Sequence, residues 1–205
     1  MDGSSHRIRN LISCATIKDI PSIVSCTNDA YIADAFFKKS SYVNRFTESN
    51  VFDLISAPNS AFLVSKSTDE KGWTVCGSIY ILWEMVPSED ETTLHQIVGK
   101  FSAVAVHREH QRMGIGHSLV AAAEDYIRDI AKKKEVELCQ LTGRKVNIGC
   151  AIKMGVINLR EDLFPWYSKQ GFSIVGEMPW DAELSRIVMT GYEHVRLIEM
   201  YKKLS

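Results

Sequence analysis

A glycine-containing loop in the middle of the chain has the residue types and spacing of an anion-binding turn. The apolar run 104–106 enters the polar segment 107–113, and Gly114 and Gly116 follow at the start of a helical pattern. Free backbone N–H groups at a helix start, together with the helix dipole, favour an anion such as pyrophosphate. Glycine lets the backbone approach such a ligand closely, and Arg112 adds a positive charge. The spacing alone fits an ordinary strand–turn–helix connection equally well.

The loop does not match either common nucleotide-binding fingerprint. The dinucleotide fingerprint requires a third glycine at the position that Leu119 occupies here. The P-loop fingerprint requires Gly-Lys-Ser/Thr after a glycine loop, and this tripeptide does not occur. The loop is therefore predicted either to be a phosphate cradle of another kind or not to bind phosphate at all.

Hydrophobic periodicity places this loop between a strand and the strongest helix of the chain. Residues 73–85 alternate as a long strand, and the next strand is predicted at 97–106. The helix is predicted over 115–134, with one apolar stripe and a surface i,i+4 pair between Glu124 and Arg128.

The remaining pattern predicts one mixed α/β or α+β domain over residues 1–205. Segment 136–149 is either a strand or an insertion, which could form a lid or an extra hairpin. The other predicted strands are 7–16, 61–65, 150–157, 172–178 and 195–201, and the other predicted helices are about 20–37, 51–56 and 163–170.

Composition narrows the class of protein. The formal net charge of -1 argues against nucleic-acid binding driven by bulk charge, and Lys132–Lys134 is expected to be a solvated helix end. Five scattered cysteines without Cys-x-x-Cys spacing predict reduced thiols and no metal site. We expect a cytoplasmic protein without a membrane segment, because no leader pattern is present and no apolar run approaches about 20 residues.

Two motifs together resemble the GCN5-related N-acetyltransferases, the GNAT proteins. The first is Gln111-Arg112-Met113-Gly114-Ile115-Gly116, between an apolar strand and a long helix. The second is Tyr167-Ser168-Lys169-Gln170-Gly171-Phe172, further along the chain. The resemblance implies a mixed, mostly antiparallel central sheet, flanked by helices and splayed at the cofactor site.

The resemblance implies acetyl-CoA as co-substrate. Its pyrophosphate would lie on the amides of 111–116, and its pantetheine arm would pair with the backbone of 104–106 as an added strand. Arg160 stands where many relatives carry an asparagine. The implied cofactor-binding residues are Val104, Ala105, Val106, Gln111, Arg112, Met113, Gly114, Ile115, Gly116, His117, Ser118, Asn158, Arg160 and Tyr167.

Catalysis would need an acid for the leaving thiolate and a base for the acceptor ammonium. Tyr167 occupies the position of the family's general acid, and the other interpretation is a packed aromatic side chain. The strand before the loop has Ser102 and no carboxylate. Glu84, at the end of the preceding strand, is the candidate base or else a surface carboxylate. His107 and Glu109 are expected to be solvated.

These residues predict an acetyl-CoA-dependent N-acetyltransferase that moves an acetyl group to a primary amine by direct attack on the thioester. The acceptor is a small molecule or a peptide, and homodimerisation is left open. The alternatives are a non-catalytic acyl-CoA-binding or regulatory module on the same fold and a nucleotide-binding regulatory protein. The acceptor pocket is expected between 19–56, 87–93, 136–149 and 178–180, with Trp83, Trp166 and Trp180 lining it or buried in the core.

Overall fold

The computed structural model describes residues 11–42, 44–69, 72–88, 93, 95–178 and 186–204. The α-helices are α1 (Ile20–Tyr31), α2 (Glu48–Ser56), α3 (Ile115–Thr142) and α4 (Leu163–Ser168). The strands are β1 (Leu11–Cys14), β2 (Ser60–Asp69), β3 (Gly72–Pro87), β4 (His95–Val106), β5 (Ile148–Ile157), β6 (Ser173–Glu177) and β7 (Leu197–Leu204). Short 3-10 helices are η1 (Ile17–Asp19), η2 (Ile32–Asp34), η3 (Ser40–Tyr42) and η4 (Arg108–His110).

The strands form one seven-stranded sheet in the order β1-β2-β3-β4-β5-β7-β6. Neighbouring strands are antiparallel except for β4 and β5, which are parallel. The long helix α3 connects that parallel pair, as a crossover must. The prediction of a mixed, mostly antiparallel sheet is confirmed. Strands β1, β6 and β7 confirm the predicted strands in part, and residues 7–10 of the first predicted strand lie outside the described residues.

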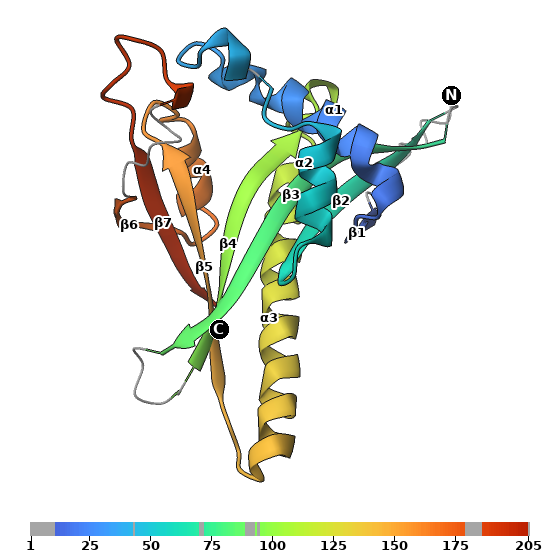
Figure 1. Ribbon diagram of the computed structural model, residues 1–205, viewed down its shortest axis with the longest axis vertical. Helices are drawn as coiled ribbons and strands as arrows, with labels where there is room; N and C mark the ends of the chain where they lie inside the picture. Colours follow the sequence, from blue (N-terminus) through green and yellow to red (C-terminus); the bar gives the residue numbers. More distant parts are fainter. Residues whose placement is uncertain are drawn as a thin grey trace, which may run out of the picture.

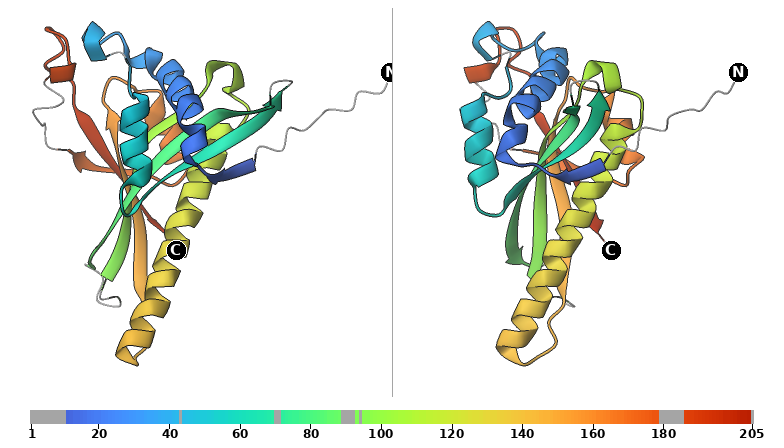
Figure 2. Two further views of the ribbon diagram at one scale, coloured as in Figure 1. Left: turned by 45° about the vertical axis from the view of Figure 1, so that its right-hand side comes forward. Right: turned by 90° about the vertical axis from the view of Figure 1, so that its right-hand side faces the viewer.

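Helices cover both faces of the sheet (Figures 1 and 2). Helix α3 packs on one face, and its predicted apolar stripe is buried there through Leu119, Val120, Ala123 and Ile127. Helices α1 and α2 pack on the other face over a second apolar cluster. None of the helices in the described ranges is long and apolar enough to cross a bilayer.

The sheet splits between β4 and β5. Their pairing runs from His95 opposite Ile148 to Phe101 opposite Met154 and stops there. Just beyond, β4 carries an extra residue relative to β3, and Ala103 has a φ of +51°. A bulge of this kind bends its strand away from its neighbour. The two strands therefore diverge toward one end of the molecule (Figure 1), which confirms the predicted splay.

Residues 136–142 continue α3 and residues 148–149 begin β5, so the segment 136–149 forms no separate strand or hairpin of its own. The helix ends at Gly143, whose φ is +66° and whose N–H donates to Cys139 O. These last turns project beyond the sheet (Figure 1), and Val136 and Leu141 are accordingly 56% and 75% exposed. Beyond Ala131 the apolar stripe thins to the half-buried Leu138, which still packs against the core cluster, and this is why periodicity predicted an early helix end.

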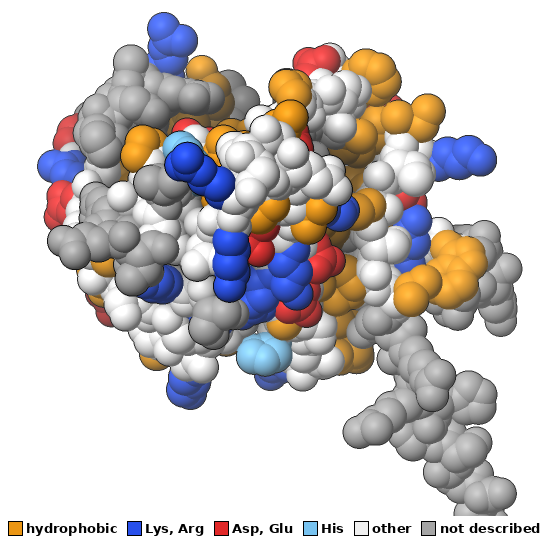
Figure 3. Space-filling model, turned by 90° about the horizontal axis from the view of Figure 1, so that it is seen from below, with side chains coloured by type: hydrophobic (Ala, Val, Ile, Leu, Met, Phe, Trp, Pro, Cys, Tyr) orange, Lys and Arg blue, Asp and Glu red, His pale blue; other side chains and the backbone are white. Residues whose placement is uncertain are grey.

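The expected surface pair on α3 is also corrected. Glu124 is buried and accepts a hydrogen bond of 2.6 Å from Lys202 Nζ on β7, with Arg128 Nη2 at 3.5 Å. The Glu124 carboxylate therefore lies on the sheet side of α3 and links this helix to β7. By contrast, Lys134 pairs with Glu137 on the exposed part of α3. Figure 3 views that end of the molecule, where Lys and Arg side chains lie among acidic ones.

Candidate active site

A cavity of about 700 Å³ opens where β4 and β5 separate. Residues from both faces of the sheet line it, because the gap between the strands joins the two faces. The lining includes β4, the glycine loop with the start of α3, the end of β5, α4, and the segment from α1 to α2.

The glycine loop is held in place by its own side chains and by α1. Gln111 Nε2 donates to Val106 O at 3.0 Å, which ties the loop to the end of β4. Asp29 on α1 accepts from the Arg108 N–H at 2.9 Å and pairs with Arg108 Nε at 2.6 Å. The loop is therefore fixed before any ligand arrives.

Gly114 begins α3 in a conformation that favours glycine. Its φ is +81°, and a Cβ added there would meet no atom within 4 Å. The first helical hydrogen bond runs from the Ser118 N–H to Gly114 O, so the N–H groups of residues 115–117 have no partner within the helix. Open space, unpaired amides and the positive end of a long helix together suit a phosphate group.

Gly116 serves a different purpose. A Cβ at this position would lie 3.3 Å from Trp166 Cζ2 on α4. The second glycine of the loop therefore makes room for the aromatic residue that precedes Tyr167. The first motif therefore lies against Trp166, the residue directly before the second motif.

Strand β4 leaves one edge unpaired beside the cavity. Beyond Phe101 its edge toward β5 has no strand partner among the described residues, and Val104 and Val106 line the cavity there. An extended ligand could add to this edge through backbone hydrogen bonds. Ala105, between them, is buried and pairs with Ser78 on β3.

Most of the predicted site residues meet at this cavity. Ala105, Met113, Ser118, Asn158 and Glu84 do not line it. Met113 is 62% exposed, and Ser118 Oγ donates to Gly114 O. The predicted residues that line the cavity are Val104, Val106, Gln111, Arg112, Gly114, Ile115, Gly116, His117, Arg160 and Tyr167.

Asn158 holds the chain segment before β7. Its Oδ1 accepts from the Arg196 N–H at 2.9 Å, and its Nδ2 donates to His194 O at 3.3 Å. Both ends of the amide are thus used within the protein.

Tyr167 is buried at the cavity wall. Its ring packs edge-on against Trp166 and Phe172, with centroids 4.6 and 5.8 Å away. Burial, reinforced by nearby Tyr31, raises the pKa of the Tyr167 hydroxyl well above its ordinary value, although Arg160 acts in the opposite direction. No hydrogen bond joins that hydroxyl to another residue in the described part of the chain. The phenol is therefore a protonated donor facing the cavity.

Arg160 is bound by two carboxylates. Its Nη1 donates to Asp34 Oδ1 at 3.0 Å, and its Nε and Nη2 bind Asp162 at 3.0 and 2.9 Å. The fork of a guanidinium suits this two-point contact. The hydrogen bonds to Asp162 and Asp34 raise the pKa of Arg160. The hydrogen bonds from Arg160 lower the pKa of Asp162. Arg160 thus joins the end of β5 to the segment after α1.

Lys38 lies beside this network. Its Nζ is 3.7 Å from Asp34 Oδ2, and burial lowers the pKa of its ammonium group. Asp34 therefore shares its charge between Arg160 and Lys38.

The structure does not bring Glu84 to the cavity. This residue lies on β3 opposite Val98, its side chain is 61% exposed, and its Oε1 is 3.5 Å from Lys153 Nζ. The lining residue of β4 that lies nearest to Glu84 is Lys100, which is opposite Leu82 on β3. A strand advances about 3.4 Å per residue, so the Glu84 backbone lies about 7 Å further along β3 than this edge of the cavity.

Several lining residues were not predicted individually. Tyr31, Lys38 and Arg45 come from the helical region that was expected only in general terms to shape the acceptor site. Lys100 and Ser102 are two residues apart on β4 and therefore share the face toward α1 and α2. Strand periodicity in the sequence could have shown that they lie on the same face. His110 lines the cavity with a buried Nδ1 that has no hydrogen-bond partner in the described part of the molecule. Pro179 and Trp180 lie outside the described residues.

No group of three or more His, Cys, Asp or Glu side chains that could hold a metal ion occurs within the described ranges. The described cysteines are free thiols.

The model of the acetyltransferase (GNAT) family matches residues 14–155, which is more than half of the chain. The match includes β4, the glycine loop and α3, the elements that form the cradle described above. The chain therefore belongs to the GNAT acetyltransferase family.

Solved structures of low identity share the fold. Arabidopsis thaliana NAA60 in complex with acetyl-CoA aligns with a TM-score of 0.63 at 12% identity, over 95% of this chain and 98% of that one. Ard1 from Thermoplasma volcanium aligns at 0.58 and 18%, over 97% and 99%. The ribosomal-protein-S18-alanine N-acetyltransferase from Escherichia coli aligns at 0.55 and 12%, over 96% and 94%. No curated protein sequence is significantly similar to this chain.

Proposed function

We propose that this protein transfers the acetyl group of acetyl-CoA to a primary amine, by direct attack of the amine on the thioester. One observation carries the proposal: a single cavity joins a glycine cradle with open anion space, an unpaired strand edge and a protonated, buried tyrosine. Similar folds are known with acetyl-CoA and with a bisubstrate analogue bound, in Arabidopsis thaliana NAA60.

The residues present fit the co-substrate. The amides at the start of α3, with Arg112, would hold its pyrophosphate, and the free edge of β4 from Ser102 to Val106 would hold its pantetheine arm. Acetyl-CoA would supply an electrophilic thioester carbonyl and a thiolate leaving group. Tyr167 would give its proton to that sulfur, since its raised pKa keeps the phenol protonated at neutral pH.

The cavity holds no free carboxylate among its described lining residues. Its two acids are Asp34 and Asp162, and both are bound to Arg160. Glu84 lies outside the cavity and pairs with Lys153. We therefore assign deprotonation of the acceptor to water rather than to a carboxylate side chain.

The acceptor is the amine of a small molecule or of a peptide. The test is release of free CoA from acetyl-CoA in the presence of amines, polyamines, amino sugars and peptides, with the acetylated product identified by mass. Transfer to one of these classes supports the proposal. If acetyl-CoA raises the melting temperature and no class is acetylated, the chain is a non-catalytic acyl-CoA-binding module.

A further inference from the structure

Positive charge exceeds negative charge on the part of the cavity that faces α1 and α2. Lys38 and Arg160 are paired with Asp34 and Asp162. Arg45 and Lys100 also line the cavity, yet neither forms an ion pair with a carboxylate of the described residues. We call Arg45 and Lys100 the cation pair.

The cation pair lies at the point where the sheet divides. Arg45 Nη2 donates to Ser102 Oγ at 3.4 Å, and the guanidinium carbon lies 5.8 Å from the centre of the Tyr31 ring. Ser102 directly follows Phe101, the last residue of β4 that pairs with β5. The arginine head group is thus placed over the start of the free strand edge.

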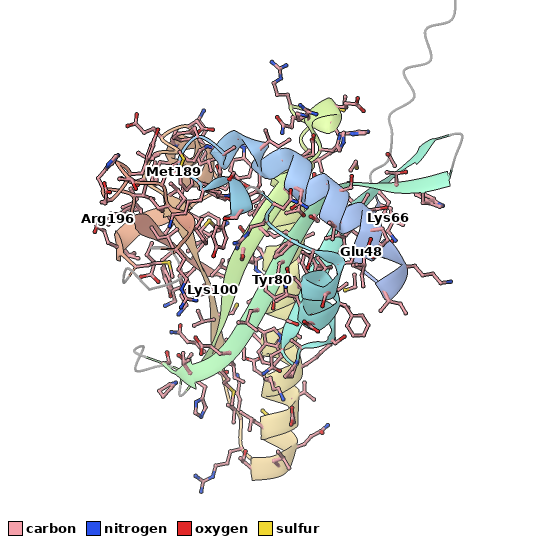
Figure 4. The ribbon with its side chains drawn as sticks, turned by 45° about the horizontal axis from the view of Figure 1, so that its top comes forward. Glu48, Lys66, Tyr80, Lys100, Met189 and Arg196 are labelled. Atoms are coloured by element: carbon pink, nitrogen blue, oxygen red, sulfur yellow. The ribbon has the colours of Figure 1, made fainter. Side chains whose placement is uncertain are left out.

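Lys100 lies on the same face of β4 as Ser102, two residues earlier, and is exposed. Two residues of a strand span about 7 Å, so the Lys100 backbone lies about 7 Å from that of Ser102, the residue that Arg45 contacts. Figure 4 labels Lys100 on β4, between Tyr80 on β3 and the segment that carries Met189 and Arg196. Both cations therefore border the same part of the cavity, on the side away from the glycine loop.

We propose that the cation pair of Arg45 and Lys100 binds a carboxylate carried by the amine acceptor. The inference rests on the proposed function, because it names the class of substrate for that same cavity. A guanidinium and an ammonium that form no ion pair with a carboxylate of the described residues are a ready site for an anion, and hydrogen bonds between charged groups are the strong ones. The acceptor is either a free amino acid or a peptide with an acidic side chain near its amino group.

The same charges assist the chemistry. Positive groups near an ammonium disfavour its charged form and favour the neutral amine, which is the form that attacks a thioester. A substrate carboxylate held by the cation pair would offset their repulsion on binding. The positive charges would thus favour loss of the acceptor's proton in a cavity whose two carboxylates, Asp34 and Asp162, are already bound to Arg160.

Binding of matched probes tests the proposal without requiring turnover. Isothermal titration in saturating CoA compares β-alanine with β-alaninamide, and the peptide amide Gly-Asp-Gly-NH₂ with Gly-Asn-Gly-NH₂. We expect the carboxylate member of at least one pair to bind about 10-fold more tightly than its amide, because hydrogen bonds between charged groups are stronger than those between a charged and a neutral group. The pair that shows this preference identifies the source of the carboxylate.

Variants connect the preference to the two residues. Arg45→Gln and Lys100→Gln should each reduce the preference for the carboxylate probe over its amide. Arg45→Glu should reverse the preference, so that the amides bind more tightly. Arg144→Gln, an exposed arginine after α3 that does not line the cavity, is the matched control and should keep it. Equal binding of acids and amides in the parent protein, or a preference that survives all three substitutions, overturns the proposal.

The two proposals fail separately. A carboxylate preference that depends on the cation pair, without acetyl transfer to either acidic probe or to the wider amine panel, rejects transferase activity and leaves the anion site in place. Acetyl transfer to amines without any carboxylate preference rejects the anion site and leaves the transferase.

Discussion

Asp34 and Arg160, 126 residues apart in the chain, are joined by a hydrogen-bonded ion pair of 3.0 Å across the cavity wall. The Asp34 side chain is only 9% exposed. This contact links the segment after α1, which faces the acceptor side, to the end of β5, where the sheet has divided. Arg160 therefore has a structural role in addition to any contact with acetyl-CoA.

Replacing Arg160 should destabilise the fold. Arg160→Gln leaves Asp34, among the described residues, with Lys38 at 3.7 Å as its cationic partner, and should lower the free energy of unfolding by about 2 kcal/mol, because a buried carboxylate loses its hydrogen-bonded partner. Asp162→Asn removes the partner whose side chain is 65% exposed and should cost less than about 1 kcal/mol. Urea unfolding of both variants measures the difference. Equal losses would contradict the role assigned to Asp34.

The glycine cradle is tested by comparing two glycines of similar geometry. Gly114 and Gly143 both have positive φ, and a Cβ at either would meet nothing within 4 Å. Glutamate at either position should therefore cost similar backbone strain, about 1–2 kcal/mol. Only Gly114→Glu places a negative charge in the proposed phosphate site.

Acetyl-CoA should raise the melting temperature of the parent protein and of Gly143→Glu, because a ligand that binds only the native state stabilises it. The increase should disappear in Gly114→Glu. An increase that persists in Gly114→Glu would place the cofactor elsewhere, and no increase in the parent protein would argue against acetyl-CoA binding.

Glu84 supplies a test of the assigned base. Because its carboxylate is 61% exposed and lies near Lys153, Glu84→Gln should leave kcat close to that of the parent protein at every pH. The measurement is kcat from about pH 6 to about pH 9, over which the fraction of neutral amine rises. A loss of rate that grows toward low pH would restore Glu84 as the base.

The mixed α/β class was predictable because its determinants are local, whereas the splay of the sheet was predicted only through the family resemblance. Alternation in β3, the apolar stripe of α3 and the two motifs all depend on short spacings that the chain itself displays. The loop motif correctly placed Gly114 at the helix start. Gly116 could not be explained from its own segment, because its partner, Trp166, belongs to a distant helix.

The part of the site that faces the acceptor was not predictable for the same physical reason. Arg45 and Ser102 meet across 57 residues, and neither belongs to a motif. Glu84 was chosen because it shares a strand face with Tyr80, but a face extends well beyond the cavity. Residues 136–142 pack against the core through the half-buried Leu138, while Val136 and Leu141 are exposed, so the apolar pattern was too sparse for periodicity to identify this segment as helix.

The pH dependence of kcat should reflect the burial of Tyr167. A general acid must be protonated, and an ordinary phenol has a pKa of about 10. Burial raises the pKa of Tyr167 above that value, so the acid stays protonated and kcat should not fall from about pH 7 to about pH 10. Saturating both substrates at each pH gives kcat directly. A decline centred below pH 10 that is absent in Tyr167→Phe would show that the phenol ionises much earlier.

The hydroxyl of Tyr167 is tested by removing it alone. Tyr167→Phe keeps the ring contacts with Trp166 and Phe172, and the hydroxyl has no hydrogen bond to another described residue, so the fold should retain its stability. If the phenol protonates the leaving sulfur, kcat should fall by roughly 10²–10⁴. Acetyl-CoA binding should hardly change, because the cradle and the strand edge carry it. Loss of kcat with binding retained marks an interaction made in the transition state.

Tyr126→Phe is the matched control for this experiment. Tyr126 lies on α3, burial also raises the pKa of its hydroxyl, and it does not line the cavity. It should therefore keep parental kcat. If Tyr167 only packs, Tyr167→Phe should behave like Tyr126→Phe, and only Tyr167→Ala should lower the melting temperature, through the cavity left by the lost ring. Parental kcat in Tyr167→Phe would end the assignment of Tyr167 as the acid, while the cradle, tested through Gly114, would stand on its own measurement.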